Sequence, residues 1–559
     1  MKTRWKCISV WVASLCMACS QPQEQPVIEV ASSKGAPRLV NLVNFIRQTD
    51  YRLPDADSLL FDAVVHQLEL MNRYDVPATF LLQYDALINP AYPALLKAQL
   101  NERSEVGAWW ELTQPQVEAA GLTWRGRYSW DPEACIAFSV GYTHDEREKL
   151  VDVYMAKFKE IFGDYPKSVG SWFIDAHTLQ YMYDKYGIEA SCNCKDQIGT
   201  DGYTLWGGYW NQAYYPSRRN GYMPAQTQEG QIPVPVFRML GSDPIYQYDE
   251  GIGGTRQAVI SLEPVYGNAG RNRAWVDYFM EALVHEPCLA FNYAQAGQEN
   301  SFTWEAMREG LEMQVPMLDS MAQSGLIRLE TLGESGRWFK QQFPLTPSTA
   351  FSVLRDLNDG KNQTVWFNSR YYRANLLWGD HSFRVRDIHL FDERFESPYL
   401  EHPGTGNQFF YETLPLVDGF VWSDTTHLAG LRLVQLDGDQ SRDLYLEDLL
   451  MVEENRQTMR ISCSDGEGHR FQFVLKDECM ELFTSSSDCS FQWALELRTA
   501  PGKKLPFTRV EASRLLARFK GYDYSIACPK GNWQLGNKQT TYALRILPED
   551  QQIVLNFKQ

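Results

Sequence analysis

The sequence predicts two folded parts, an α/β barrel followed by an all-β, sandwich-like domain. Between residues 38 and 332 short apolar runs alternate with amphipathic helical patterns, which predicts parallel strands joined by crossover helices. After about residue 345 the segments are short, alternate in polarity and are separated by Gly, Asp and Asn, which is typical of antiparallel sheets. The 559 residues are also too many for one compact core.

The first part is expected to contain seven strands and six longer helices. The predicted strands are 38–45, 78–83, 105–110, 168–175, 188–194, 289–296 and 327–332, and the predicted helices are 57–74, 91–101, 144–162, 176–186, 274–285 and 303–324. The helix at 144–162 has the clearest period, with a single apolar stripe closed by Gly163. These elements fit a barrel or a doubly wound sheet, and seven strands with a long insertion at 196–260 favour the barrel.

The N-terminus is predicted to be an export signal. Lys2, Arg4 and Lys6 precede an apolar run that is too short to span a bilayer, and a small residue stands before Cys19. This arrangement resembles a bacterial lipoprotein signal, with Cys19 as the lipidated residue. Since Cys16 stands where such signals usually carry Leu, a plain secretory signal is the alternative.

Four segments follow from these patterns. They are a lipoprotein signal peptide at 1–18, a polar, Pro-containing tether at 19–36, the barrel at 37–345 and the sandwich-like domain at 346–559. The expected location is the cell envelope, with the exported protein held on the membrane through the lipid on Cys19 alone.

Composition limits the classes of partner. Hydrophobic residues make up 44% of the chain and charged residues 22%, as in folded globular proteins. The formal net charge is -17, and the sequence contains no basic run. A nucleic-acid partner is therefore not expected, because phosphate-binding surfaces concentrate Lys and Arg.

Polar residues follow most of the predicted barrel strands. In parallel α/β folds the ligand site lies at the carboxyl ends of the strands, because the loops that leave those ends converge there. The candidate binding residues selected in this way are Arg47, Asp50, Trp109, Trp110, His177, Asn193, Asp196 and Glu299. Each one alone could equally be an ordinary polar or aromatic residue at the end of a strand.

Loop aromatics add a second set of candidates and point to sugar as the ligand. Seven of the 15 tryptophans that remain after signal cleavage lie between 109 and 210, several of them in non-periodic loops rich in Gly, Tyr and Arg. Aromatic faces stack on the apolar faces of sugar rings, while nearby charged and amide groups bond the hydroxyls. The loop set is Trp124, Arg125, Arg127, Trp130, Asp131, Trp206 and Trp210. The alternative is that these long loops fold on their own aromatics.

The segments "ATFLLQ", "EVGAW" and "GDYPKSVGSWFIDAHTLQYMYDKYGI" resemble the glycoside hydrolase/polysaccharide deacetylase superfamily. The likeness covers about 38–195 and implies a deacetylase-like, distorted (β/α)7 barrel. With the sandwich behind it, the chain looks like an uncharacterised family of bacterial lipoproteins in that superfamily.

The resemblance departs from the metal-dependent deacetylases of the superfamily. Those enzymes place two Asp after the first strand and a His-x-x-x-His pair after a later one, whereas this chain has Asn44 and Phe45 at the first place and Trp109 and Glu111 at the second. None of its nine histidines forms a close-spaced pair. We therefore expect no metal and no other cofactor. A polysaccharide deacetylase is the less favoured functional hypothesis.

The metal-independent glycoside hydrolases of the superfamily use two carboxylates from strand ends. On this basis Glu111 is assigned as the ionised nucleophile and Asp175 as the general acid. Asp243 is the reserve acid, because a loop can bring it over the same rim. The predicted function is an envelope lipoprotein that hydrolyses an oligo- or polysaccharide. The alternatives are a glycan-binding lipoprotein on the same fold and a structural envelope protein.

Overall fold

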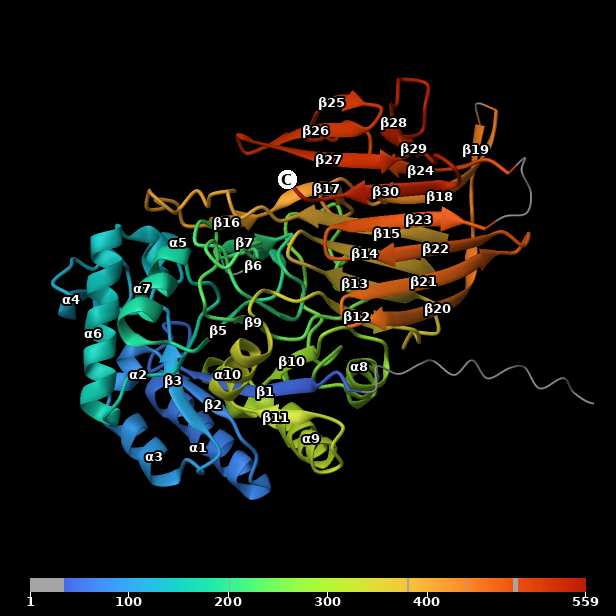
Figure 1. The fold of residues 1–559 in the computed structure, drawn as a ribbon. Coiled ribbons are helices and arrows are strands. Elements are labelled where there is room, and N and C mark those ends of the chain that lie inside the picture. The colour runs from blue at the N-terminus through green and yellow to red at the C-terminus, as the bar shows by residue number, and fades with distance from the viewer. Residues whose placement is uncertain (1–34, 201, 380–381, 439, 486–490) are drawn as a thin grey trace, which may run out of the picture.

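The computed structural model describes residues 35–200, 202–379, 382–438, 440–485 and 491–559 (Figure 1). The predicted signal peptide, Cys19 and nearly all of the predicted tether lie outside these residues. In the part of the chain that the structure describes, no helix combines the length and the apolar character needed to cross a membrane.

A parallel sheet that curves into a nearly closed barrel forms the first part. Its strands follow the order β10-β1-β2-β3-β4-β5-β9, with β11 also paired to β1 and β8 added antiparallel beyond β9. Their bounds are β1 (Arg38–Ile46), β2 (Thr79–Leu82), β3 (Glu105–Trp109), β4 (Ser168–Gly170), β5 (Ala190–Asn193), β8 (Ala213–Tyr214), β9 (Val236–Arg238), β10 (Asn292–Ala296) and β11 (Arg328–Glu330). The predicted fold class is confirmed.

β9 and β10 face each other without backbone pairing, and side chains close the barrel between them. The rings of Phe237 and Tyr293 lie 4.9 Å apart, and Gln212 donates a 2.7 Å hydrogen bond to Asn292. β9 lies inside the segment that was expected to be an insertion. Its three residues, which follow a proline, are too few to show a period.

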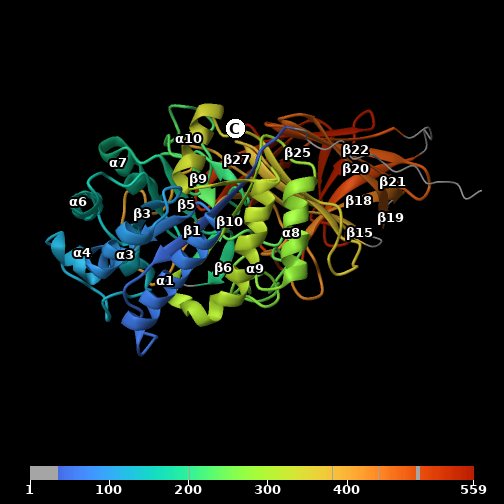
Figure 2. The same ribbon diagram turned by 90° about the horizontal axis from the view of Figure 1, so that it is seen from below.

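Helices surround the barrel on its outer side (Figures 1 and 2). They are α1 (Ala56–Tyr74), α2 (Tyr84–Ile88), α3 (Ala91–Gln99), α4 (Gln114–Ala119), α5 (Ala134–Ala137), α6 (His144–Phe162), α7 (Ala176–Tyr186), α8 (Arg273–His285), α9 (Thr303–Gln323) and α10 (Leu332–Gln342), with short 3₁₀ turns at Ser139–Gly141 and Asn300–Phe302. α6 begins with a capping box between Thr143 and Glu146 and ends at Gly163, whose φ of 90° suits glycine.

Two antiparallel sheets form the C-terminal part and lie beside the barrel (Figures 1 and 2). The first sheet contains β12 (Thr349–Val353), β13 (Gln363–Asn368), β14 (Tyr372–Gly379), β15 (Ser382–Leu390), β17 (Leu414–Asp418), β18 (Gly430–Asp437), β19 (Gln440–Asp443), β24 (Trp493–Arg498), β28 (Asn532–Leu535) and β29 (Leu544–Leu547). The second contains β20 (Leu446–Asn455), β21 (Thr458–Asp465), β22 (Arg470–Leu475), β23 (Cys479–Thr484), β25 (Phe507–Glu511), β26 (Arg514–Phe519), β27 (Tyr522–Lys530) and β30 (Gln552–Asn556). Phe473 of the second sheet packs against Trp378 and Phe383 of the first, so the sheets share a core.

A small sheet and a buried ion-pair network join the two parts. β7 (Tyr203–Trp206), which pairs with β6 (Gln197–Thr200), also pairs in parallel with β16 (Phe409–Glu412) of the C-terminal part. Asp196 forms ion pairs with Arg238, at 2.6 Å, and with Arg373 of β14. Burial would raise the pKa of Asp196, but the two arginines lower it below its usual value. Asp196, predicted to bind substrate, therefore holds the two parts together instead.

We expect Asp196→Asn to destabilise the protein by about 3 to 5 kcal/mol, because it leaves two buried guanidinium groups short of a counter-charge. Urea denaturation followed by tryptophan fluorescence measures this change. The matched control is Glu396→Gln, which removes an exposed ion pair of 2.7 Å between Arg219 and the C-terminal part and should cost less than about 1 kcal/mol. Equal, small effects of both variants would contradict this role for Asp196.

Candidate functional site

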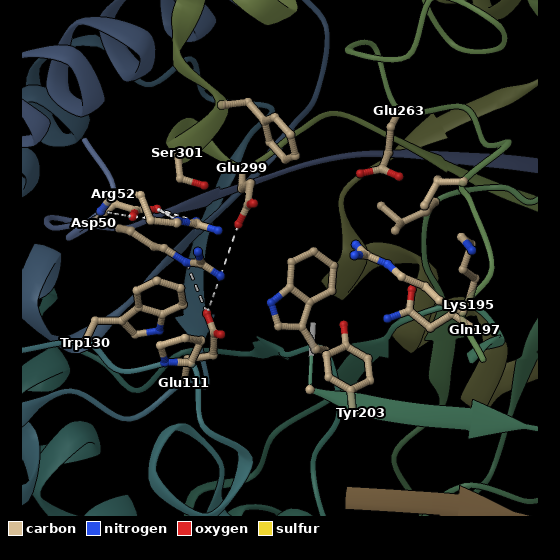
Figure 3. A pocket seen from close by; sticks show the side chains of 18 of the residues that line it. Asp50, Arg52, Glu111, Trp130, Lys195, Gln197, Tyr203, Glu263, Glu299 and Ser301 are labelled. Atoms are coloured by element: carbon tan, nitrogen blue, oxygen red, sulfur yellow. Dashed lines mark hydrogen bonds and ion pairs between the residues drawn. The ribbon is translucent and has the colours of Figure 1, made fainter. Parts of the chain in front are cut away.

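A cavity of about 1130 Å³ opens at the carboxyl ends of the barrel strands (Figure 3). Its wall includes residues that follow four strands, namely Arg47 after β1, Glu111 after β3, Lys195 after β5 and Glu299 after β10. The loops of the insertion and Asn407 and Gln408 of the C-terminal part complete the wall. The cavity therefore lies where the ligand sites of parallel α/β folds occur.

Arg47 lies between the carboxylates of Glu111 and Glu299, two wall residues that Figure 3 labels. Its Nη2 atom lies 2.8 Å from Oε2 of Glu111 and 3.2 Å from Oε2 of Glu299. Because both oxygens contact the same nitrogen, they are no more than about 6 Å apart. All three side chains are at least 93% buried, so solvent screens their charges weakly.

The position of Arg47 is fixed by its neighbours. Its backbone N–H donates to Asn300 Oδ1 at 2.9 Å, and Asn300 Nδ2 donates back to the Arg47 carbonyl at 2.8 Å. The guanidinium lies over the ring of Trp130, 4.3 Å from its centroid, in cation–π geometry. Arg52 lies 5.3 Å from the same ring and bonds Asp50, with Nε to Oδ1 at 2.8 Å. These contacts hold the guanidinium before any ligand arrives.

The two carboxylates have different surroundings. Oε2 of Glu111 accepts hydrogen bonds from Arg47 Nε and Nη2 and a 2.6 Å bond from the Trp109 indole, whereas no described residue donates to its Oε1. Burial raises the pKa of Glu299 to about 7, with Arg47 opposing the rise and the charge of Glu111 adding to it. The site therefore pairs a carboxyl group held by three donors with a second one, Glu299, that can carry a proton near neutral pH.

Lys195, Gln197, Tyr203 and Glu263 lie on the opposite wall (Figure 3). Burial lowers the pKa of Lys195, whose ammonium donates to the Asp196 carbonyl at 3.3 Å. Trp172 also lines the cavity, edge-on to Trp109 with ring centroids 5.5 Å apart. Sequence reasoning did not select these residues. Lys195 follows directly on a predicted strand and could have been found there, whereas Gln197, Tyr203 and Glu263 belong to the insertion or follow it.

Of the predicted site residues, the structure brings five together around the cavity: Arg47, Asp50, Glu111, Trp130 and Glu299. Four of them follow barrel strands directly or within a few residues. Trp130, from the loop between α4 and α5, reaches the wall beside Arg47.

Asp175 does not line the cavity, contrary to its predicted role as general acid. It is the N-cap of α7, accepting from the Thr178 backbone N–H at 3.0 Å, and it forms a 2.9 Å ion pair with Arg147. Burial alone would raise its pKa, but Arg147 and the hydroxyls of Ser139 and Thr178 lower it below its usual value. The structure thus makes Asp175 a buried anion that caps a helix.

Asp243 does not line the cavity either. It accepts from the backbone N–H groups of Ile245, at 2.8 Å, and Tyr246, at 2.6 Å, and from the Trp275 indole at 2.8 Å. Burial raises the pKa of Asp243, as a general acid would need, but its oxygens are occupied in bracing a turn.

The other candidates of the loop between α4 and α5 hold the loop itself together. Trp124 packs against the hydrophobic core and donates to the Tyr128 carbonyl at 2.9 Å. Arg125 donates to the carbonyls of Cys135 and Gly141, and Arg127 forms a 2.9 Å ion pair with the buried Asp131. The structure assigns these four residues to loop packing instead of to the cavity wall.

The remaining candidates also lie off the wall. Trp109 is buried beneath Glu111 and stacks on Phe45 at 4.0 Å, so it supports the site from below. The other five make packing or polar contacts elsewhere: Trp110 against Tyr154, His177 against His144, Asn193 with Tyr214, Trp206 with Asp418 and Trp210 against Trp366.

Metal-ligating side chains do not gather at the cavity in the described part of the chain. There, the one group of His, Cys, Asp and Glu close enough to share a cation is Asp465, Glu467 and His469, at the turn between β21 and β22. His469 already bonds Asp465 at 2.7 Å, and Glu467 forms an ion pair with Arg442. None of the three residues lines the cavity.

Comparison with solved structures identifies the fold. A protein from Parabacteroides distasonis, provisionally described as a glycoside hydrolase/deacetylase, matches with a TM-score of 0.50 at 15% identity, over 70% of this chain and 92% of its own. The chain has the deacetylase-like fold. Because residues 37–345 make up little more than half of the chain, this match extends beyond the barrel.

Other matches are weaker. Proteins provisionally described as polysaccharide deacetylases, from Mycobacterium smegmatis and Pseudomonas aeruginosa PAO1, give TM-scores of 0.33 and 0.34 at 11% and 14% identity. They cover 58% and 56% of this chain and 97% and 94% of their own. No protein-family model matches the sequence, and no curated protein gives a significant match.

Proposed function

We propose that this protein is a metal-independent glycoside hydrolase that acts on an oligo- or polysaccharide and retains the anomeric configuration. The observation that carries the proposal is the placement of Glu111 and Glu299 on one nitrogen of Arg47, with their Oε2 atoms no more than about 6 Å apart. Retaining glycosidases place their two carboxyl groups about 5 to 5.5 Å apart. The description of the P. distasonis protein as a glycoside hydrolase/deacetylase supports the same class of substrate.

In the first step Glu111 is the nucleophile and Glu299 the acid. Oε1 of Glu111, which no described residue bonds, attacks the anomeric carbon while protonated Glu299 gives its proton to the leaving glycosidic oxygen. The C–O bond to the leaving sugar breaks, and an ester to Glu111 forms. Glu299 then takes a proton from water as the water oxygen displaces Glu111, which restores both carboxyl groups.

Arg47 and two aromatic rings complete this assignment. Arg47 positions both carboxylates and balances the charge that shifts between them. Trp130 and Trp172 supply aromatic surfaces for a sugar ring. Lys195, on the opposite wall, can donate to sugar oxygens.

A glycan-binding protein on the same fold is the second candidate. One observation favours it: Arg47 already pairs its charge with Glu111 and Glu299 without a substrate, as in a site that only orients polar groups. The same aromatic surfaces would then bind sugar without cleavage. Turnover separates the two candidates.

We expect Glu111→Gln to cut turnover of a glycan substrate by several orders of magnitude for every leaving group, because it removes the nucleophile. Glu299→Gln should cut turnover of natural glycans as strongly, but should spare aryl glycosides whose leaving group departs without a proton. Reducing-end release and aryl-alcohol release measure the two effects. If both variants stay within about tenfold of the parent, the pair is not catalytic.

The pH profile tests the same assignment with the unmodified protein. Because Glu299 must carry a proton to act as the acid and its pKa is raised to about 7, turnover of natural glycans should fall as the pH rises above about 7. The matched control is Asp175→Asn. This variant should change the stability of the protein, but its turnover should fall over the same pH range as that of the parent.

Activity should survive EDTA, since the described cavity wall brings no set of metal ligands together. The measurement is turnover before and after chelation, with metal content determined by mass spectrometry. Stoichiometric zinc in the purified protein, with turnover lost on its removal and restored on its return, would overturn the metal-independent mechanism.

We also propose that the protein is anchored in the cell envelope through a lipid on Cys19, as the sequence of the N-terminus suggests. Cys19→Ala should move the protein from the membrane fraction to the soluble fraction, as measured by fractionation and immunoblotting. A variant that remains membrane-bound to the same extent would contradict the anchor.

A further inference from the structure

Two tyrosines at the mouth of the cavity stack on each other in the open. Tyr51 belongs to the loop between β1 and α1, and Tyr128 to the loop between α4 and α5. Their ring centroids lie 4.1 Å apart, their planes differ by 2°, and the two residues are 44% and 43% exposed. We refer to Tyr51 and Tyr128 as the tyrosine pair.

The tyrosine pair continues the aromatic surface of the cavity. Tyr51 itself lines the cavity, and its ring lies 6.1 Å from that of Trp130, which in turn lies under Arg47. A bound chain that extends from the carboxylates along this wall therefore contacts Trp130 first and then the tyrosine pair. Neither tyrosine hydroxyl bonds a described residue, so both can bond a ligand.

The loop around Tyr128 is held in place without a ligand. The Trp124 indole donates to the Tyr128 carbonyl at 2.9 Å, and the Gln114 N–H donates to the Ser129 carbonyl at 2.7 Å. The ion pair of Arg127 with buried Asp131 fixes the chain on the other side of the turn. Binding at the tyrosine pair would thus cost little ordering of the loop.

We propose that the tyrosine pair is a sugar subsite, separate from the reacting position, that binds a further unit of an oligosaccharide chain. This inference rests on the proposed function and makes the substrate a chain of several sugars instead of a single glycoside. Exposed aromatic rings suit the apolar faces of sugars, and free hydroxyls suit their polar edges. The cavity volume of about 1130 Å³ slightly exceeds the range common for small-molecule pockets, as a chain requires.

The test compares short and long substrates. For cello-, xylo- and chito-oligosaccharide series, Tyr128→Ala should lower kcat/KM about tenfold for the longer members that are cleaved and leave the shortest cleaved member unchanged. Tyr128→Phe keeps the aromatic ring and should therefore retain most of the parent's kcat/KM for the longer members. The matched control is Tyr445→Ala, which removes a tyrosine that is 54% exposed in the C-terminal part and should not depend on chain length.

Several outcomes would overturn the subsite. They are an equal loss for short and long members, no loss for either, or a change in sedimentation that shows the pair to be a contact between two copies of the chain. If the parent protein cleaves none of the glycans but binds long ones, the glycosidase assignment fails alone, and the same chain-length comparison by calorimetry decides the subsite. If it neither cleaves nor binds any, both proposals fail.

Discussion

The arrangement of the barrel mouth depends on one guanidinium group buried between two carboxylates. Burying three charges together is costly, and the cost is offset only if each charge finds close partners. Arg47 meets that condition through Glu111, Glu299 and the face of Trp130, and the Trp109 indole adds a donor to Glu111. The loops after β1, β3 and β10 are thereby fixed relative to one another at the point where a ligand would enter.

Much of the barrel could be predicted because its strands are buried on both faces. Every residue of β1 is buried, so its apolar run stands out in the sequence, and the same holds for β2. β9 escaped prediction because a strand of three residues carries too little pattern. The antiparallel part was predictable from the alternation of polar and apolar residues in its short segments, although the order of its strands was not predicted from the sequence.

The site was only partly predictable, because a buried carboxylate at the end of a strand can have a structural role instead of a role in the site. A strand-end rule placed Glu111 and Glu299 on one rim correctly, because backbone topology alone brings those positions together. The same rule selected Asp175 and Asp196, and a loop was expected to bring Asp243 over the same rim. In the structure Asp175 caps a helix, Asp196 joins two parts of the chain and Asp243 braces a turn. Their partners, such as Arg147 and Arg373, lie far away in the sequence or on other elements, so no local pattern reveals them.

The pairing of β7 with β16 has a consequence for how this molecule could be divided. A cut after residue 345 would separate two regions that differ clearly in secondary structure, yet it would remove Asn407 and Gln408 from the cavity wall and Arg373 from Asp196. β7 would also lose its neighbour beside Tyr203, which faces the cavity. The boundary between folds is therefore not a boundary between modules: the sandwich cannot be exchanged for another without rebuilding the mouth of the barrel.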